Sequence, residues 1–360
     1  MKTKFDHGGN VLAVARSLGV SPAEILDFSA SINPLGPAVG VREALADAFD
    51  TIVHYPDSDC SALREALALS HGVKSANICV ANGSTELIYL LPRLVHGKRA
   101  LLIAPSFSEY ARSLARDNCQ AEYLVLQSTD GFSLTMDQLA ERLNEGYDIC
   151  ILGNPGNPTG RLYPLVQVKE FFHLCRSAGS LLVVDEAFMD FSEDESAKHI
   201  ATDNDGILIL RSMTKFYSLP GLRLGYAIAS ELTTERISAL REPWSVNTPA
   251  QAAGIVSLAA EGYADSTRRL IAAEREHLSA GLAAIPGLRP FPSAANYLLV
   301  EISKGPPAWE VASRLRAQHI LIRDCSNFTG LDGRFFRVAV RSPGENERLI
   351  SALASAIGQI

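Results

Sequence analysis

Short apolar runs rich in β-branched residues alternate along the middle of the chain with longer segments of helical periodicity. The apolar runs predict buried strands at residues 100–104, 121–126, 148–152, 181–184, 206–211 and 224–229. The periodic segments predict helices at residues 85–95, 109–117, 165–178 and 232–241. Because helices of this length suit the crossover between parallel strands, the pattern indicates an α/β domain with a mostly parallel sheet.

The pattern changes near residue 260. A long helical segment at 265–284 is followed by strands at 296–302, 320–323 and 335–340, by a helix at 308–318 and by a C-terminal helix. This mixed order predicts a smaller α+β domain. We therefore expect three parts: an N-terminal segment (1–44) that packs on the small domain, a large domain (45–260) and the small C-terminal domain (261–360).

Composition narrows the class of protein. The 360 residues are 47% apolar and carry a net charge of −7, which gives no general attraction to nucleic acid or to anionic membranes. No uncharged apolar stretch reaches the roughly 18 residues of a membrane helix, and the N-terminus lacks the apolar core of a signal peptide. The six cysteines form no C-x-x-C pair, so we expect reduced core thiols in a cytoplasmic protein, with neither a metal site nor disulfides.

Lys215 stands among hydroxyl groups and an arginine, in a pattern that would suit an aldehyde cofactor bearing a phosphate. A lysine amine can hold pyridoxal 5'-phosphate as a Schiff base. Ser212, Thr214 and Arg223 would bind the cofactor phosphate, since the guanidinium fork matches phosphate oxygens. By itself, such a motif is more often a solvated loop; the rest of the chain favours the cofactor site.

Polar residues follow several predicted strands, where α/β proteins bind ligands. Asp185 ends an apolar strand and could pair with a pyridine nitrogen, and a rigid turn aims Asn157 at the same edge of the sheet. Gly83-Ser84-Thr85 opens a helix and forms an anion site, while Tyr110 could stack on a cofactor ring. Each also has a plain structural explanation: a helix cap, a turn or a core aromatic.

Taken in this order, the residues strongly resemble the fold-type I pyridoxal-phosphate enzymes, whose fold is that of aspartate aminotransferase. The resemblance implies that Asn157 contacts the ring hydroxyl, Asp185 the ring nitrogen and Lys215 the aldehyde carbon. It also implies that Tyr55 reaches the cofactor phosphate from a second subunit, which makes the protein a homodimer. Phe188 departs from the tyrosine of many aminotransferases and would remove one hydrogen bond to the ring hydroxyl.

Within that superfamily the chain is similar to the histidinol-phosphate aminotransferase branch. The resemblance is carried by His7-Gly8-Gly9-Asn10 and by residues 27–36, 243–247, 295–299, 320–325 and 336–341. It is greater to the members that decarboxylate L-threonine O-3-phosphate for cobalamin biosynthesis, since the aminotransferases usually lack the His-Gly-Gly-Asn stretch. The resemblance thus implies decarboxylation; transamination of histidinol phosphate or a similar compound is the alternative, and a non-catalytic cofactor-binding module is a more distant one.

An anionic substrate is also predicted from the residues themselves. Arg323 and Arg337 lie at the end of and within apolar strands, where an unpaired guanidinium is costly, so we expect them to meet a carboxylate and a phosphate. A buried salt bridge with Asp324 or Glu301 is the alternative. On the resemblance, His7 and Asn33 are candidates for the substrate phosphate, and Asn157 for a substrate contact as well.

Overall fold

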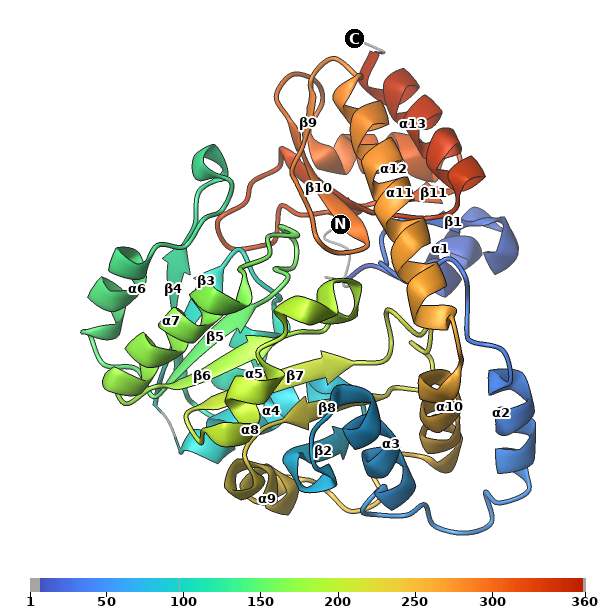
Figure 1. The fold of residues 1–360 in the computed structure, drawn as a ribbon. Coiled ribbons are helices and arrows are strands. Elements are labelled where there is room, and N and C mark those ends of the chain that lie inside the picture. Colours follow the sequence, from blue (N-terminus) through green and yellow to red (C-terminus); the bar gives the residue numbers. More distant parts are fainter. Residues whose placement is uncertain (1–6, 97, 359–360) are drawn as a thin grey trace.

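The computed structural model describes residues 7–96 and 98–358. It contains a large central sheet and a second, smaller sheet in the C-terminal part of the chain (Figure 1). The central sheet has seven strands. Their spatial order is β2 (Ile78–Ala81), β8 (Gly225–Ile228), β7 (Ile207–Ser212), β6 (Leu181–Asp185), β5 (Ile149–Gly153), β3 (Arg99–Ala104) and β4 (Gln120–Val125).

Most strands of this sheet run parallel, as the sequence predicts. The pairs β7–β6, β6–β5, β5–β3 and β3–β4 are parallel, and only β8 is antiparallel to its neighbours β7 and β2. The expected α/β class is therefore confirmed. The prediction missed β2, because a run of only four apolar residues cannot be told from a buried turn or helix end by periodicity.

Both faces of the central sheet are covered, so alternate side chains of one strand enter different cores. In β5, Ile149 and Ile151 pack on one face, and Cys150 and Leu152 on the other. The first core includes side chains of α4 (Ser84–Val95), α5 (Glu109–Arg116) and α9 (Glu231–Leu240). The second includes those of α3 (Ser61–His71), α6 (Met136–Leu143), α7 (Leu165–Ser177), α8 (Lys198–Asp203) and α10 (Thr248–Ala259).

The C-terminal part forms a second layer with its own core. Its four-stranded antiparallel sheet has the order β12 (Arg323–Asp324), β13 (Phe335–Ala339), β10 (Tyr297–Ile302) and β9 (Leu288–Pro290). It packs with α11 (Tyr263–Ala283), α12 (Ala308–Arg316) and α13 (Pro343–Gly358) around buried leucines, isoleucines and valines. At residues 320–323 the single expected strand is wrong: the chain leaves one pairing partner for another after β11 (Ile320–Leu321).

The N-terminal segment joins the C-terminal part through its backbone. After α1 (Val11–Leu18) and the 3₁₀ turn η1 (Pro22–Glu24), strand β1 (Leu26–Asp27) pairs in parallel with β11. Helix α2 (Val41–Phe49) then lies against α10 (Figure 1). Further 3₁₀ turns are η2 (Ser75–Asn77), η3 (Ser128–Asp130) and η4 (Met189–Glu195). The domain boundaries after residues 44 and 260 stay predictions.

The thiols and the helices bear on two further expectations from the sequence. All six cysteines are buried and free, as expected of core thiols. None of the helices within residues 7–96 and 98–358 is both long and apolar enough to cross a membrane.

Candidate active site

A cavity of about 360 Å³ opens where β5, β6 and β7 end. The last residue of each of these strands lines it, because the carboxyl ends of parallel strands meet at one edge of the sheet. Residues from the N-terminal segment and from the C-terminal part close its other walls. Among the predicted site residues, the lining includes His7, Ser84, Thr85, Tyr110, Asn157, Asp185, Ser212, Thr214, Lys215, Arg223, Arg323 and Arg337.

Lys215 follows β7 and borders the cavity. No side-chain hydrogen bond is made by its amine within residues 7–96 and 98–358, and protein surrounds the partly buried side chain. Burial, together with the guanidinium groups of Arg337 and Arg223, lowers the pKa of the Lys215 amine to about 8, while Asp185 opposes this shift. A lysine with this pKa has a substantial neutral fraction near pH 8, as an amine nucleophile requires.

The start of α4 and the loop after β7 form an anion cradle. The first turn of a helix presents N–H groups with no partner within the helix, and Ser84 and Thr85 add hydroxyl groups. Gly83 has a φ of 77°, and a Cβ there would lie 2.6 Å from Arg223 Nη2. At Gly225 a Cβ would lie 2.3 Å from the Ser84 nitrogen. Glycine at both positions therefore lets the guanidinium and the strand approach the helix end.

Two more hydroxyl groups complete this cradle. Ser212 Oγ lies 2.8 Å from Thr214 Oγ1, and both residues border the cavity beside Lys215. Because hydroxyl groups and an arginine surround one point, the donor set suits a phosphate. The predicted phosphate-binding residues, Tyr55 excepted, are thus brought together within one chain.

Asp185 also borders the cavity, at the end of β6. Its Oδ2 accepts a hydrogen bond of 2.6 Å from the Tyr110 hydroxyl, and its Oδ1 accepts one of 3.0 Å from the Ala187 N–H. Burial raises the pKa of the Asp185 carboxyl, while these two donors and Lys215 oppose the rise. A cation placed beside this carboxylate would be strongly favoured, since it would restore the charge balance lost by burial.

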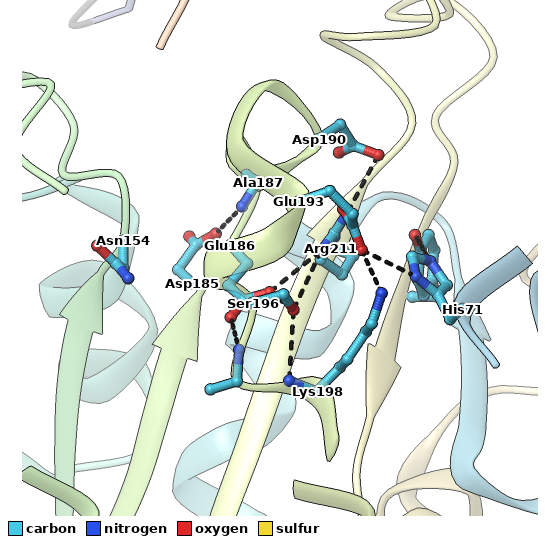
Figure 2. A network of polar contacts seen from close by, with 12 residues as sticks. His71, Asn154, Asp185, Glu186, Ala187, Asp190, Glu193, Ser196, Lys198 and Arg211 are labelled. Atoms are coloured by element: carbon cyan, nitrogen blue, oxygen red, sulfur yellow. Dashed lines mark hydrogen bonds and ion pairs between the residues drawn. The ribbon is translucent and has the colours of Figure 1, made fainter. Parts of the chain in front are cut away.

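A buried ionic network centred on Arg211 lies beside the end of β6 (Figure 2). Strand alternation turns Glu186 and Arg211 away from the cavity, and Arg211 Nη1 lies 3.1 Å from Glu186 Oε2. Arg211 also pairs with Asp190 and Glu193. Burial alone would raise the pKa of the Glu193 carboxyl, but Arg211 and His71 hold it below its usual range. Removing Arg211 would leave several buried carboxylates uncompensated, at a cost of about 3–5 kcal/mol.

Arg337 projects from β13 into the cavity from the C-terminal part. Its guanidinium donates to Asn157 Oδ1 and, at 3.2 Å, to the Ser29 carbonyl, and it lies 4.8 Å from the ring centre of Tyr297. Within the described part of the chain no carboxylate pairs with it; Glu301 pairs with Arg289 and Arg334 instead. A buried guanidinium of this kind is prepared for an anionic ligand.

Arg323 and His7 line a wall of the same cavity. Arg323 donates to the Asp324 carbonyl at 2.7 Å and to Asn327 Oδ1 at 2.8 Å, and it lies over the ring of Phe328. His7 contacts the ring of Phe107. The cavity therefore carries cationic or protonatable groups at more than one point, which suits a substrate with two anionic groups.

Comparison with known proteins places this arrangement in a family. The model of the aminotransferase class I and II family matches residues 23–353. The chain belongs to the aminotransferase class I and II family. It is 40% identical to the threonine-phosphate decarboxylase of Salmonella typhimurium, over 98% of this chain and 96% of that one. It is also 31% identical to the adenosylcobalamin biosynthesis bifunctional protein CobDQ of Leptospira interrogans, over 97% of this chain and 41% of that one.

Solved structures agree with this placement. The histidinol-phosphate aminotransferase of Clostridium acetobutylicum superposes with a TM-score of 0.87 at 27% identity, covering 93% of this chain and 100% of that one. The L-threonine-O-3-phosphate decarboxylase of Porphyromonas gingivalis does so with a TM-score of 0.82 at 26% identity and the same coverages. The resemblance predicted from the sequence is confirmed, both for the fold and for the two kinds of relative.

Three predicted residues of this aminotransferase-family site do not line the cavity. Gly83 lies behind the cradle, where it lets Arg223 approach. Tyr55 is 81% exposed and does not border this cavity within one chain. Asn33 is buried, and its amide donates to the Phe216 carbonyl, Tyr263 Oη and Thr267 Oγ1. We therefore leave Asn33 out of the proposed substrate site. Its side chain instead links the N-terminal segment to residues 216, 263 and 267.

The structure adds two residues to which the sequence analysis gave no role. Ser31 borders the cavity, and its buried hydroxyl has no hydrogen-bond partner within the described residues. Glu109, in the first turn of α5, contacts His7. Neither could be found from the pattern, because a serine in a turn and a glutamate at a helix start have ordinary local explanations. Phe188, where many relatives were expected to have tyrosine, packs edge to face on Tyr297 and gives the cavity an apolar wall.

Proposed function

We propose that this protein decarboxylates L-threonine O-3-phosphate, with pyridoxal 5'-phosphate as cofactor, and yields (R)-1-aminopropan-2-yl phosphate for cobalamin biosynthesis. The observation that carries the proposal is the Lys215 amine, whose pKa is lowered to about 8 and which borders the same cavity as the anion cradle and the Asp185 carboxylate. The substrate and the pathway rest on the similarity to the threonine-phosphate decarboxylase and to the cobalamin biosynthesis protein.

The residues present fit the cofactor. The cradle formed by the start of α4, Ser212, Thr214 and Arg223 would hold its phosphate, and Asp185 would hold its pyridine nitrogen in the protonated form. Asn157 would contact the ring hydroxyl and Tyr110 would cover the ring. When bound, the cofactor supplies an electron sink for cleavage of a bond at the substrate's Cα.

Arg337 and Arg323 would position the substrate. Arg337, assisted by Asn157, would bind the carboxylate, and Arg323 together with His7 would bind the phosphate. Two fixed ends leave the substrate little freedom to rotate, so these residues determine which Cα bond is presented for cleavage. Lys215 would then return a proton to Cα, for which a pKa of about 8 is well matched to neutral pH.

The proposal is tested by incubating the purified protein and pyridoxal phosphate with L-threonine O-3-phosphate, with and without 2-oxoglutarate. We expect release of carbon dioxide and of aminopropanol phosphate without the oxo acid, detected by mass spectrometry. The second candidate is an aminotransferase acting on histidinol phosphate, which the solved histidinol-phosphate aminotransferase structure favours. Glutamate formation that depends on 2-oxoglutarate, without loss of carbon dioxide, would identify that activity and contradict ours.

The pKa of Lys215 predicts how cofactor loading depends on pH. Only the neutral amine attacks an aldehyde, so below pH 8 the loading rate of cofactor-free protein should rise by about tenfold per pH unit. It should level off above a pKa of about 8. The rate is measured from the absorption of the bound cofactor between about pH 6 and pH 9, with a free lysine derivative of pKa about 10.4 as the control. A rate that keeps rising like the control's would contradict the lowered pKa.

The same proposal includes a homodimer with a shared site. Tyr55 lies with its ring centre 4.8 Å from that of Trp244, and both rings are exposed. Other large apolar side chains exposed in this part of the sequence are Leu35, Val39, Phe49, Ile52 and Val53. Exposed apolar side chains of this kind favour an interface with a second copy of the chain. Tyr55 of one copy would then reach the cofactor phosphate bound in the other. Light scattering should give twice the chain mass of 38.8 kDa; a monomer would contradict the shared site.

A further inference from the structure

The N-terminal turn at His7-Gly8-Gly9 lies against the segment that follows β1. A Cβ at Gly8 would lie 2.0 Å from the Ser29 carbonyl oxygen, so any larger residue would push the turn away. Gly9 has a φ of 85°, and its N–H donates to Ser29 Oγ at 2.9 Å. The two glycines therefore let the backbone approach Ser29 closely, and this approach places the His7 side chain at the cavity wall.

Glu109 holds the other end of this arrangement. Its Oε1 accepts from His7 Nε2 at 2.8 Å and from Arg112 Nη1 at 2.8 Å, while its Oε2 accepts from the Tyr89 hydroxyl at 2.8 Å. Burial would raise the pKa of the Glu109 carboxyl, but these three donors hold it below its usual value. The carboxylate is thus charged, fixed in orientation and matched by cations.

This contact decides which nitrogen of His7 remains for a ligand. Nε2 lies 2.8 Å from Glu109 Oε1 and 3.2 Å from Arg112 Nη1, whereas the other ring nitrogen, Nδ1, has no partner within residues 7–96 and 98–358. The His7 side chain is 43% exposed and lines the same cavity as Arg323. When both ring nitrogens carry a proton, an imidazolium held in this way can donate its Nδ1–H to an anion. Because Glu109 already fixes the ring, binding then costs less rotamer freedom than it would for a free surface side chain.

We propose that Glu109 is a positioning residue that fixes His7 so that Nδ1 donates to the substrate phosphate, and that it thereby sets the preference for phosphorylated over unphosphorylated amino substrates. This inference rests on the proposed function, because it names the specificity of the same site. Glu109 does not touch the substrate itself, and its negative charge is balanced by Arg112 and by His7 when the imidazole is protonated. A phosphate dianion at the cavity wall is therefore not repelled by an unpaired Glu109 carboxylate.

The chain offers a matched control for Glu109. Glu122, on β4, also accepts from a tyrosine hydroxyl, that of Tyr147, and also pairs with arginines, Arg99 and Arg142. It does not border the cavity. Glu122→Gln therefore removes a carboxylate with similar partners and leaves the site alone.

The experiment measures equilibrium binding rather than turnover. The cofactor-loaded protein is titrated with 1-aminopropan-2-yl phosphate and with 1-aminopropan-2-ol, neither of which has a carboxylate to lose, and binding is followed by calorimetry. We expect Glu109→Gln to weaken binding of the phosphorylated amine by roughly tenfold and to change binding of the plain amine by less than about twofold. Glu122→Gln should change neither, and thermal unfolding checks that each variant is folded.

His7→Ala provides the second variant, since an exposed side chain near the terminus is not needed for folding. It should produce the same selective loss, and adding Glu109→Gln to it should weaken binding no further. Equal losses for both amines, or additive losses in the double variant, would overturn the inference. If carbon dioxide is released but Glu109→Gln keeps its phosphate preference, this inference fails alone; if no carbon dioxide is released while the selective loss persists, the decarboxylase proposal fails and the Glu109–His7 contact stands.

Discussion

Replacing Lys215 with alanine is expected to lower kcat for carbon dioxide release by about 10⁴-fold or more. The side chain is the amine that would hold the cofactor and the proton donor at the substrate's Cα, so one substitution removes two functions. Among the described residues that border the cavity no other amine can replace it, because the other basic groups there are guanidinium groups and the imidazole of His7. The measurement is initial-rate carbon dioxide release with saturating cofactor.

The control for this prediction is Lys198→Ala. Lys198 is also largely buried, with a side chain 13% exposed, but it pairs with Glu193 in the ionic network and does not border the cavity. It should keep kcat within a few fold of the wild-type value, provided that thermal unfolding shows it to be folded. Normal turnover by Lys215→Ala would end the proposed mechanism.

Replacing Asp185 with asparagine is expected to lower kcat by about 10³-fold. The amide has nearly the same shape: its oxygen can accept from the Ala187 N–H while its NH2 group donates to the Tyr110 hydroxyl oxygen, so the cavity should keep its form. It has no negative charge, however, and cannot stabilise a protonated pyridine nitrogen. The loss should therefore appear in kcat, with a smaller change in KM.

Two further variants separate charge from shape. Asp185→Glu keeps the carboxylate, although it moves it by one methylene group, and should recover part of the lost activity. Asp148→Asn alters a carboxylate at the other end of the same sheet, where it accepts from the Lys98 and Arg99 N–H groups, and should leave kcat unchanged. If Asp185→Asn were as active as Asp148→Asn, the role given to Asp185 would be wrong.

Local patterns predicted most of the large sheet and much of the site. The five parallel strands are short apolar runs, and Asp185 and Ser212 end two of them, so their meeting at one edge follows from the α/β pattern. Lys215 follows the end of β7 closely and Arg223 precedes β8 closely, and the motif around Lys215 predicted both. Prediction failed where a strand is too short to show periodicity, as at β2, and where one apolar run serves two sheets, as at β11 and β12.

Asn33 shows the limit of reasoning from a motif. A turn asparagine near the start of the chain suits a ligand contact and a structural clamp equally well, and the sequence cannot separate the two. In the fold its amide is surrounded by three acceptors from residues 216, 263 and 267, which leaves it no donor for a substrate. Ser31, in the same segment, borders the cavity, and its hydroxyl has no hydrogen-bond partner within the described residues.

The sequence by itself determined the fold class, and it predicted the cofactor chemistry centred on Lys215 and an anionic substrate, because periodicity and side-chain type are local properties. Only the tertiary structure decided that Arg337 donates to Asn157, 180 residues earlier in the chain, rather than to Glu301, and that His7 meets Glu109 across 102 residues. Such contacts depend on how helices and sheets pack, so the residues next to each partner in the sequence do not predict them.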